Sequence, residues 1–419
     1  MSWSYLSNPS GKRYIVGHTD LDGIARAAAV KAAVGEWRDA VPIIVYSRRI
    51  PATMPNTLPE ALSGHIAERV PSGSTVLFED IPVDVHNPAK YISALRTFCV
   101  TRTCIWTDHH ETDAPYLPQL TDATMYNNGK AMWFGPDAYD YTLALIQWLG
   151  GDPERARPYA ILTGIGDRNP KVVQILPEDE LRRWLRIADG LDVIIREVSA
   201  NSDPALYDML VESMARNLDE VIAEAVQKAD QIPTPTAVET IGTTVALVTE
   251  QLHPSWGPKS LERAALKAGT IYAIGVSPNP RDQTYAVRAI TYWVTMAKNP
   301  AAGKPIGLTQ AFQRWLSAQG RRAYGPPAAP VVSGYATFER ALTAARELAN
   351  AVAAERYEPA TAHLVSDKYV AQAVAADYAT ILSKLTEILE QQKKMYEEYL
   401  NLKRKQVELL EQTGRNEYD

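Results

Sequence analysis

Short runs of β-branched and aliphatic residues alternate with longer helix-like segments along the first third of the chain, and this alternation most constrains the fold. We expect strands at Arg13–Val16, Pro42–Tyr46, Thr75–Phe78 and Thr103–Trp106. Ala-rich or amphipathic segments separate them, each long enough to cross back over a sheet. They are Leu21–Val34, Leu58–Arg69 and Asn87–Phe98. The pattern predicts an α/β fold with a doubly wound parallel sheet.

Helical patterns continue beyond the fourth strand and lead to a second unit. The expected helices are Pro136–Leu149, Pro153–Gly164, Glu178–Leu191 and one long helix, Pro204–Ala229. A smaller α/β unit follows, with strands expected at Thr244–Val248, Thr270–Val276 and Thr284–Ile290 and helices near Leu308–Ala318 and Thr337–Ala351. We predict domains over residues 1–200 and 237–356, joined by a connecting helix and linker over 201–236.

The last part of the chain, residues 357–419, is rich in Glu, Lys, Gln and Leu. Steps of four and three residues pick out a helical seam of Ile381, Leu385, Ile388, Gln392, Met395, Tyr399, Leu402, Gln406 and Leu409. This heptad register predicts a coiled-coil-like helical tail. The tail could mediate homo-oligomerisation, dock a protein partner, or fold back on its own chain.

The composition narrows the classes of partner. The chain has 419 residues, is 46% hydrophobic and carries a formal net charge of -6, so no global positive field would attract long duplexes. Its two cysteines, Cys99 and Cys104, lie in or beside an apolar stretch, which favours reduced core thiols. With no signal-like or membrane-spanning segment, we expect a cytoplasmic protein without a membrane partner.

Carboxylates follow two of the expected strands at the point where each strand ends. The segment His18-Thr19-Asp20-Leu21-Asp22-Gly23 comes directly after the first strand, and Asp80 follows the third. Open parallel sheets bind ligands at the carboxyl ends of their strands. Two carboxylates two residues apart can serve two neighbouring cations, while Gly23 lets the backbone turn into the next helix.

Two more features complete a candidate metal site. Asp108, His109 and His110 follow the fourth strand, and Asp167 ends the segment Thr163-Gly164-Ile165-Gly166-Asp167. Imidazole adds a ligand suited to manganese or a similar ion, and Asp108 can orient a histidine from behind. Taken singly, such features are typical of turns, helix caps or surface histidines. Clustered, they would repel one another without a cation, so together they predict a two-metal site.

These features and their order along the chain resemble the motifs of the DHH phosphoesterase superfamily. The matching motifs are His18-x-Asp20-x-Asp22-Gly23, Asp80, Asp108-His109-His110 and Gly-x-Gly-Asp167. The resemblance covers roughly the first half of the chain. That superfamily includes RecJ-type single-strand exonucleases, nanoRNases, cyclic dinucleotide and pAp phosphodiesterases and family II inorganic pyrophosphatases. The spacing at His18 resembles archaeal RecJ-like members, which disfavours pyrophosphate as the substrate.

The resemblance implies roles for the matching residues. Asp20 resembles a ligand of one metal, with His18 as an additional candidate ligand. The second metal would be held by Asp22, His109 and Asp167, and Asp80 would bridge the two. His110 resembles a phosphate contact, and Asp80, Asp108, His109 and His110 form the implied catalytic set. The implied cofactors are two divalent ions, manganese first, with magnesium or cobalt as alternatives.

The second half of the chain departs from the family pattern. Members usually carry a second domain with a Gly-Gly-Gly-His-like loop that grips the substrate. The nearest match here, Gly325-Pro326-Pro327-Ala328-Ala329, has no histidine. Arg288 is therefore our candidate substrate contact, with Arg281 and Ser277 as alternatives.

Three functional hypotheses follow. The first is a metal-dependent hydrolase that cleaves phosphodiester bonds in short or single-stranded RNA or DNA, as an exonuclease or nanoRNase does. The second is a phosphodiesterase for a small nucleotide, such as a cyclic dinucleotide or pAp, which the acidic chain would tolerate more easily. The third is a scaffold of this fold that docks a partner in a nucleic-acid-processing complex without catalysis.

Overall fold

A computed structural model describes residues 11–45, 58–84, 87–201, 203–279, 283–298 and 331–354, together with Trp315. Four of the sequence predictions lie outside the described residues. They are the helical tail, the loop with Gly325, Arg281 and, apart from Trp315, the helix expected over Leu308–Ala318. The domain boundaries given above stay predictions.

The first part of the chain forms a five-stranded parallel sheet, as the alternating pattern predicts. The strands are β1 (Arg13–His18), β2 (Val41–Val45), β3 (Thr75–Glu79), β4 (Thr103–Asp108) and β5 (Lys130–Trp133). Their order across the sheet is β2-β1-β3-β4-β5. All four pairings are parallel. The chain therefore reverses its direction across the sheet between β1 and β3, and a ligand crevice is expected at this point.

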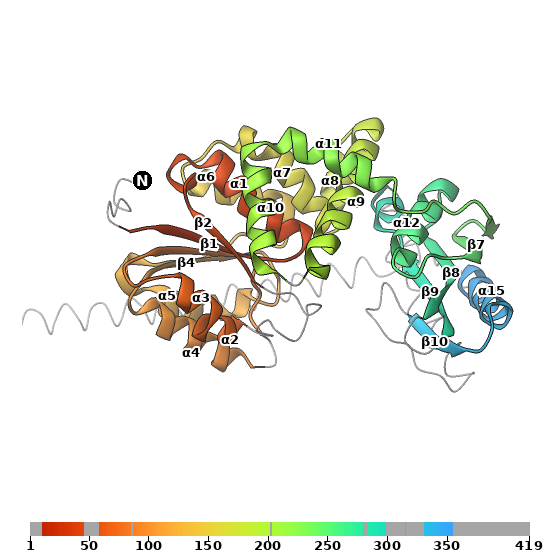
Figure 1. Ribbon diagram of the computed structural model, residues 1–419, viewed down its shortest axis with the longest axis horizontal. Helices are drawn as coiled ribbons and strands as arrows, with labels where there is room; N and C mark the ends of the chain where they lie inside the picture. The colour runs from red at the N-terminus through yellow and green to blue at the C-terminus, as the bar shows by residue number, and fades with distance from the viewer. Residues whose placement is uncertain are drawn as a thin grey trace, which may run out of the picture. The chain divides into compact units, whose positions relative to one another are not determined.

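Helices cover both faces of this sheet (Figure 1). On one face lie α2 (Leu58–Ser63), α3 (His65–Arg69), α4 (Pro88–Cys99) and α5 (Leu117–Thr124). On the other lie α1 (Leu21–Ala33), α6 (Ala138–Trp148), α7 (Pro153–Gly166) and α10 (Pro204–Arg216). Alternate strand residues supply the two cores: Ile15 and Leu77 enter one, and Val16 and Phe78 enter the other.

The helices that lead out of the sheet differ in part from the sequence prediction. Short helix α8 (Pro170–Ile175) precedes α9, which runs over Glu178–Ala200 and is longer than expected. The single helix expected over Pro204–Ala229 is wrong. Asn217 has non-helical φ and ψ of -146° and 70°, so the segment divides into α10 and α11 (Leu218–Ala229).

The second unit contains a mixed five-stranded sheet. Its strands are β6 (Val238–Ile241), β7 (Val245–Gln251), β8 (Tyr272–Asn279), β9 (Thr284–Thr291) and β10 (Val331–Tyr335). The order is β10-β9-β8-β7-β6, antiparallel except for the parallel pair β7 and β8. The crossover between that pair is α12 (Gly257–Ala268), which the sequence prediction missed. Helices α13 (Trp293–Lys298) and α15 (Phe338–Ala354) follow.

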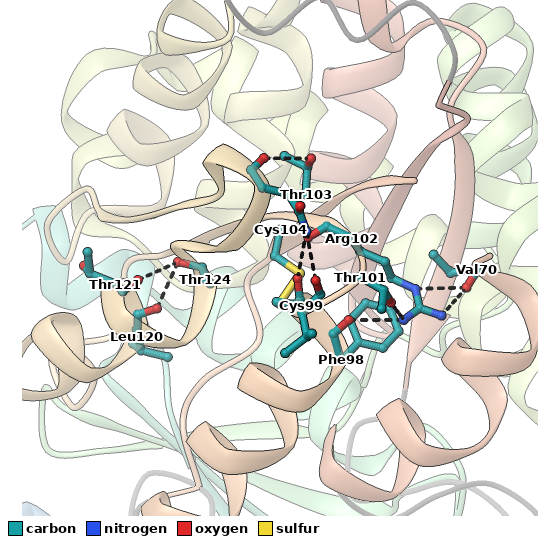
Figure 2. Close-up of a disulfide and its surroundings, with 12 residues drawn as sticks. Val70, Phe98, Cys99, Thr101, Arg102, Thr103, Cys104, Leu120, Thr121 and Thr124 are labelled. Carbon is teal, nitrogen blue, oxygen red and sulfur yellow. Dashed lines mark hydrogen bonds between the residues drawn. A yellow bond between two sulfur atoms is a disulfide. The ribbon is translucent and has the colours of Figure 1, made fainter. Parts of the chain in front are cut away.

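Cys99 and Cys104 form a disulfide, so the expectation of reduced thiols is wrong. Helix α4 ends at Cys99 and β4 begins at Thr103, and this tight corner brings the two Cα atoms to 5.7 Å, within disulfide range. Arg102 holds the corner by donating to the carbonyl oxygens of Val70 and Phe98 (Figure 2). The disulfide removes the cysteine-based ground for a cytoplasmic location. Among the described helices, none has both the length and the apolar character needed to cross a membrane.

Candidate metal centre

The turn from β1 into α1 presents two carboxylates. Asp20 caps α1, and its side chain accepts a hydrogen bond from the backbone N–H of Gly23 at 3.3 Å. A Cβ on residue 23 would lie 2.7 Å from Cβ of His18, so only glycine fits this close turn. Asp22 stands in the first helical turn and is buried. His18 Nδ1 lies 2.6 Å from Asp20 Oδ2, which fixes both side chains.

Asp80 follows β3 in a strained backbone conformation. Its φ is +57°, in the left-handed region that a residue other than glycine rarely adopts. The backbone N–H of Asp80 donates to the carbonyl oxygen of Thr107 on β4, which holds this conformation. The carboxylate is 2% exposed. Strain of this kind is typical of functional sites, where the surrounding structure holds it in place.

The end of β4 carries the histidine pair. Asp108 Oδ1 accepts hydrogen bonds from the backbone N–H groups of His109 and His110 and from His110 Nδ1. His109 Nε2 lies 3.1 Å from Asp80 Oδ1, and the His109 ring stacks on Tyr141 of α6 at 5.3 Å. The ends of β3 and β4 therefore meet at this place, and Asp108 holds the His110 ring and the backbone of both histidines.

Asp167 closes the site from α7. Gly166, the last residue of α7, packs so tightly on α1 that an added Cβ would lie 3.0 Å from the backbone nitrogen of Asp22. This close approach brings Asp167 Oδ2 to 4.0 Å from His109 Nδ1. The following residue, Arg168, has a φ of +57°, a second strained position at this edge.

The ligand atoms converge in three overlapping groups, in each of which they lie within 4.8 Å of one another. The groups are Asp80, Asp108, His109 and His110; Asp22, His109 and Asp167; and Asp20, Asp22 and Asp80. The structure thus brings together seven of the eight candidates from this part of the chain. His18 contacts Asp20 but belongs to none of the three groups.

Burial and mutual repulsion dominate the electrostatics. Burial, followed by the charges of Asp20 and Asp80, raises the pKa of Asp22 well above its ordinary value. Burial also raises the pKa of Asp80, but the guanidinium of Arg26 and the hydrogen bonds with His109 and Asp22 together hold that pKa well below its usual range. Burial lowers the pKa of His110, yet the hydrogen bond and charge of Asp108 raise it to about 9. These shifts are typical of carboxylates crowded at one place.

The residues present fit divalent cations. Asp108 Oδ2 and His109 Nδ1 are buried and have no hydrogen-bond partner, although a buried polar atom without one is costly. Both are atoms that a metal ion accepts as a ligand. Carboxylate oxygens with imidazole nitrogens form a donor set suited to manganese-like ions. Asp20, Asp22, Asp80, His109 and Asp167 would hold such ions.

Two charged residues of the site were missed by sequence reasoning. Arg26 of α1 and Glu79 of β3 are fully buried beside Asp80. Arg26 lies one helical turn after Asp22, so the helical period places it on the same face. That spacing was the available signal, but the surrounding run of alanines hid it.

Arg288 lies on β9 and belongs to none of the three ligand groups, but it lines a cavity of about 1250 Å³ that Asp22 and Asp80 also line. Its Nε donates to Ser277 Oγ at 2.6 Å, which joins two of the residues proposed from the sequence as substrate contacts. Arginines of α9, including Arg182, Arg186 and Arg196, line the same cavity. The cavity therefore combines an anionic cluster with several guanidinium groups.

Comparisons with known proteins find fold likeness at low identity only. No protein-family model and no curated protein matches the chain. A pGpG-specific phosphodiesterase, PggH from Vibrio cholerae, matches over 82% of this chain and 100% of its own, with 12% identity and a TM-score of 0.45. CDC45 from Entamoeba histolytica matches over 82% and 96%, with 7% identity and a TM-score of 0.39. An uncharacterized protein from Helicobacter pylori covers 81% and 98%, with 12% identity and a TM-score of 0.27. At these TM-scores the likenesses carry no argument about function, which rests on the side chains of the metal centre.

Proposed function

We propose that the chain is a metal-dependent phosphoesterase that hydrolyses phosphodiester bonds in short or single-stranded nucleic acid. The observation that carries this proposal is the overlap of the three ligand groups. Asp22, Asp80 and His109 each belong to two of them. Shared ligands of this kind suit two neighbouring divalent ions, and manganese is the ion we expect. Such ions, when bound, supply Lewis-acid polarisation of the phosphoryl oxygens.

The chain's own residues supply the remaining chemistry. Asp108 holds His110 through Nδ1, which leaves Nε2 of the imidazole as the donor toward an incoming phosphate. Asp108 raises the pKa of His110 to about 9 against the effect of burial, which favours the protonated ring. His110 would therefore contact a phosphate oxygen and can give up a proton at Nε2.

The basic side chains of α9 support an extended anionic substrate over a small one. Arg182 and Arg186 lie one helical turn apart, line the cavity, and have half-exposed or exposed side chains. Their partners, Glu178 and Asp230, form ion pairs with them at the surface. Such pairs are worth little, so a phosphate can displace the carboxylates at small cost. Arg288 is our proposed substrate contact from the second sheet.

The test is hydrolysis of a matched panel: a dinucleotide, a ten-residue single strand, a cyclic dinucleotide and pAp. We expect the wild type with manganese to cleave the single strand, and chelation or Asp80→Asn to lower the rate at least about a hundredfold, as loss of a metal ligand should. Asp122 is an exposed carboxylate on α5, and Asp122→Asn is the matched control. Arg288→Ala should raise KM more than it lowers kcat.

Each other outcome has a definite meaning. Faster turnover of the cyclic dinucleotide or pAp than of the single strand would replace the substrate class with a small nucleotide. If the wild type hydrolyses none of the four substrates with manganese, magnesium or cobalt, the enzyme hypothesis is contradicted and the non-catalytic scaffold is favoured.

A further inference from the structure

Arg26 is a fully buried guanidinium in the wall of the metal centre. Its side chain is 0% exposed. Burying such a charge is costly unless it is paired and hydrogen-bonded. Nη1 lies 2.9 Å from Asp80 Oδ2 and 3.3 Å from Glu79 Oε2. The residue is thus paired with two consecutive carboxylates at the end of β3.

The guanidinium is also fixed from α6. Nε of Arg26 donates to Thr142 Oγ1 at 3.2 Å, and the guanidinium carbon stands 4.3 Å from the centre of the Tyr141 ring. Carboxylates, a hydroxyl and an aromatic face therefore hold Arg26 in one orientation. A planar guanidinium suits such a place because its donors have a fixed fork geometry.

This arrangement divides the two oxygens of Asp80. Oδ2 receives Arg26, whereas Oδ1 faces His109 Nε2 at 3.1 Å and His110 Nδ1 at 4.0 Å. The strained backbone at Asp80, with φ of +57°, adds a second restraint on the carboxylate. Oδ1 of Asp80 therefore faces the two histidines, and Oδ2 is held by the guanidinium.

Glu79 is the second buried carboxylate that contacts Arg26. It is 0% exposed, and its Oε1 lies so close to β1 that a Cβ on Gly17 would meet it at 2.3 Å. Arg26 and Glu79 form an internal pair, and Asp80 lies against the guanidinium of that pair.

We propose that Arg26 is a positioning residue that makes Asp80 a one-oxygen ligand and thereby favours manganese-sized ions over calcium. This inference rests on the proposed function. Calcium takes carboxylates through one or both oxygens and accepts flexible, higher coordination, whereas smaller ions demand near-ideal octahedral geometry. A carboxylate with Oδ2 already engaged cannot adopt the two-oxygen mode that is open to calcium without giving up Arg26.

The test is calorimetric titration of the full-length chain with Mn²⁺ and separately with Ca²⁺. The double variant Arg26→Met with Glu79→Gln removes both members of the internal pair and leaves the net charge unchanged. We expect Mn²⁺ affinity to fall about 10- to 100-fold, the usual effect of losing a group that orients a ligand. Ca²⁺ affinity should fall less, so the preference for Mn²⁺ narrows at least about tenfold.

Two further variants keep the test decisive. Arg26→Lys keeps the positive charge but loses the planar guanidinium with its fixed donors, so it should also narrow the preference for Mn²⁺ over Ca²⁺. If the double variant does not fold, Arg26→Lys alone provides the test. Lys31→Met is the matched control. Lys31 is another buried cation of α1, paired with Glu212 and with the carbonyl oxygens of Arg38 and Ala40. The Lys31→Met variant should leave the preference for Mn²⁺ over Ca²⁺ unchanged.

An unchanged Mn²⁺ to Ca²⁺ ratio in the folded Arg26 variants, or an equal change in Lys31→Met, would overturn the inference while leaving the proposed function intact. A wild type that binds no Mn²⁺ would instead contradict the proposed function itself.

Discussion

At the scale of single residues, one oxygen of Asp108 organises the histidine pair. Asp108 is 0% exposed, and its Oδ1 accepts from the His109 N–H at 2.5 Å, the His110 N–H at 2.9 Å and His110 Nδ1 at 2.6 Å. Three donors on one acceptor fix the backbone and one imidazole together. The conformation after β4 therefore depends on an acceptor at this place more than on a negative charge.

We expect different effects from two substitutions of Asp108. Asp108→Ala removes the acceptor, so Mn²⁺ affinity and hydrolysis should each fall about 10- to 100-fold. Asp108→Asn keeps an oxygen that can accept from the same backbone donors, so Mn²⁺ affinity should fall less than about tenfold. Hydrolysis should fall further than Mn²⁺ affinity, because the charge of Asp108 that raises the pKa of His110 is lost. Calorimetry and steady-state kinetics on both variants measure this. An equal loss of Mn²⁺ affinity in the two variants would show that the charge of Asp108, and not its hydrogen-bond geometry, matters for metal binding.

The sequence indicates most of the candidate ligands because each has a local signal. Asp20 and Asp80 follow strands, and Asp108 to His110 end another. Arg26 had no comparable signal. A long cation in a helix is ordinarily expected at the surface, and only its contacts with β3 and α6 show why it is buried.

At the scale of elements, α9 and α11 cross at a glycine. A Cβ on Gly190 would lie 1.7 Å from the carbonyl oxygen of Ala225, closer than any side chain can approach a backbone. The two helices therefore depend on the missing side chain for their contact. Helix α9 also lines the cavity beside the metal centre, so this crossing supports the wall on which Arg182 and Arg186 stand.

We predict that Gly190→Ala destabilises the protein although alanine is the better helix former. Overpacking costs about 1–3 kcal/mol and exceeds the gain in helix propensity of about 1 kcal/mol. The midpoint of thermal unfolding should fall. Gly35→Ala is the control, because a Cβ there meets nothing within 4 Å and should change the midpoint little. A Gly190→Ala protein as stable as the control would refute the tight crossing.

The elements that could be predicted are those with strong periodic patterns. The first four strands are rich in Val, Ile and Thr, and their expected positions agree with the structure to within two residues. Strand β5, Lys130–Trp133, has no β-branched residue and is half-exposed or exposed, so it gave no alternating signal. The break at Asn217 was missed because the residues on both sides of it continue a helical pattern.

At the scale of the molecule, strand order creates the site. Asp20 follows β1 and Asp80 follows β3, and these neighbouring strands flank the point where the chain reverses its direction across the sheet. Local patterns predict strands but not which strands become neighbours, so the sequence alone indicated a parallel sheet without its order. The pairing of β1 with β3 explains why residues 60 positions apart share a ligand group.

We propose that the cluster of candidate ligands at this edge of the sheet binds divalent cations. The most direct measurement is anomalous diffraction from crystals of the wild-type protein soaked with Mn²⁺. We predict two anomalous peaks among Asp20, Asp22, Asp80, His109 and Asp167, because three overlapping ligand groups suit two neighbouring ions. Absence of any peak among these residues at saturating Mn²⁺, or peaks confined to other parts of the chain, would contradict divalent-cation binding by this cluster.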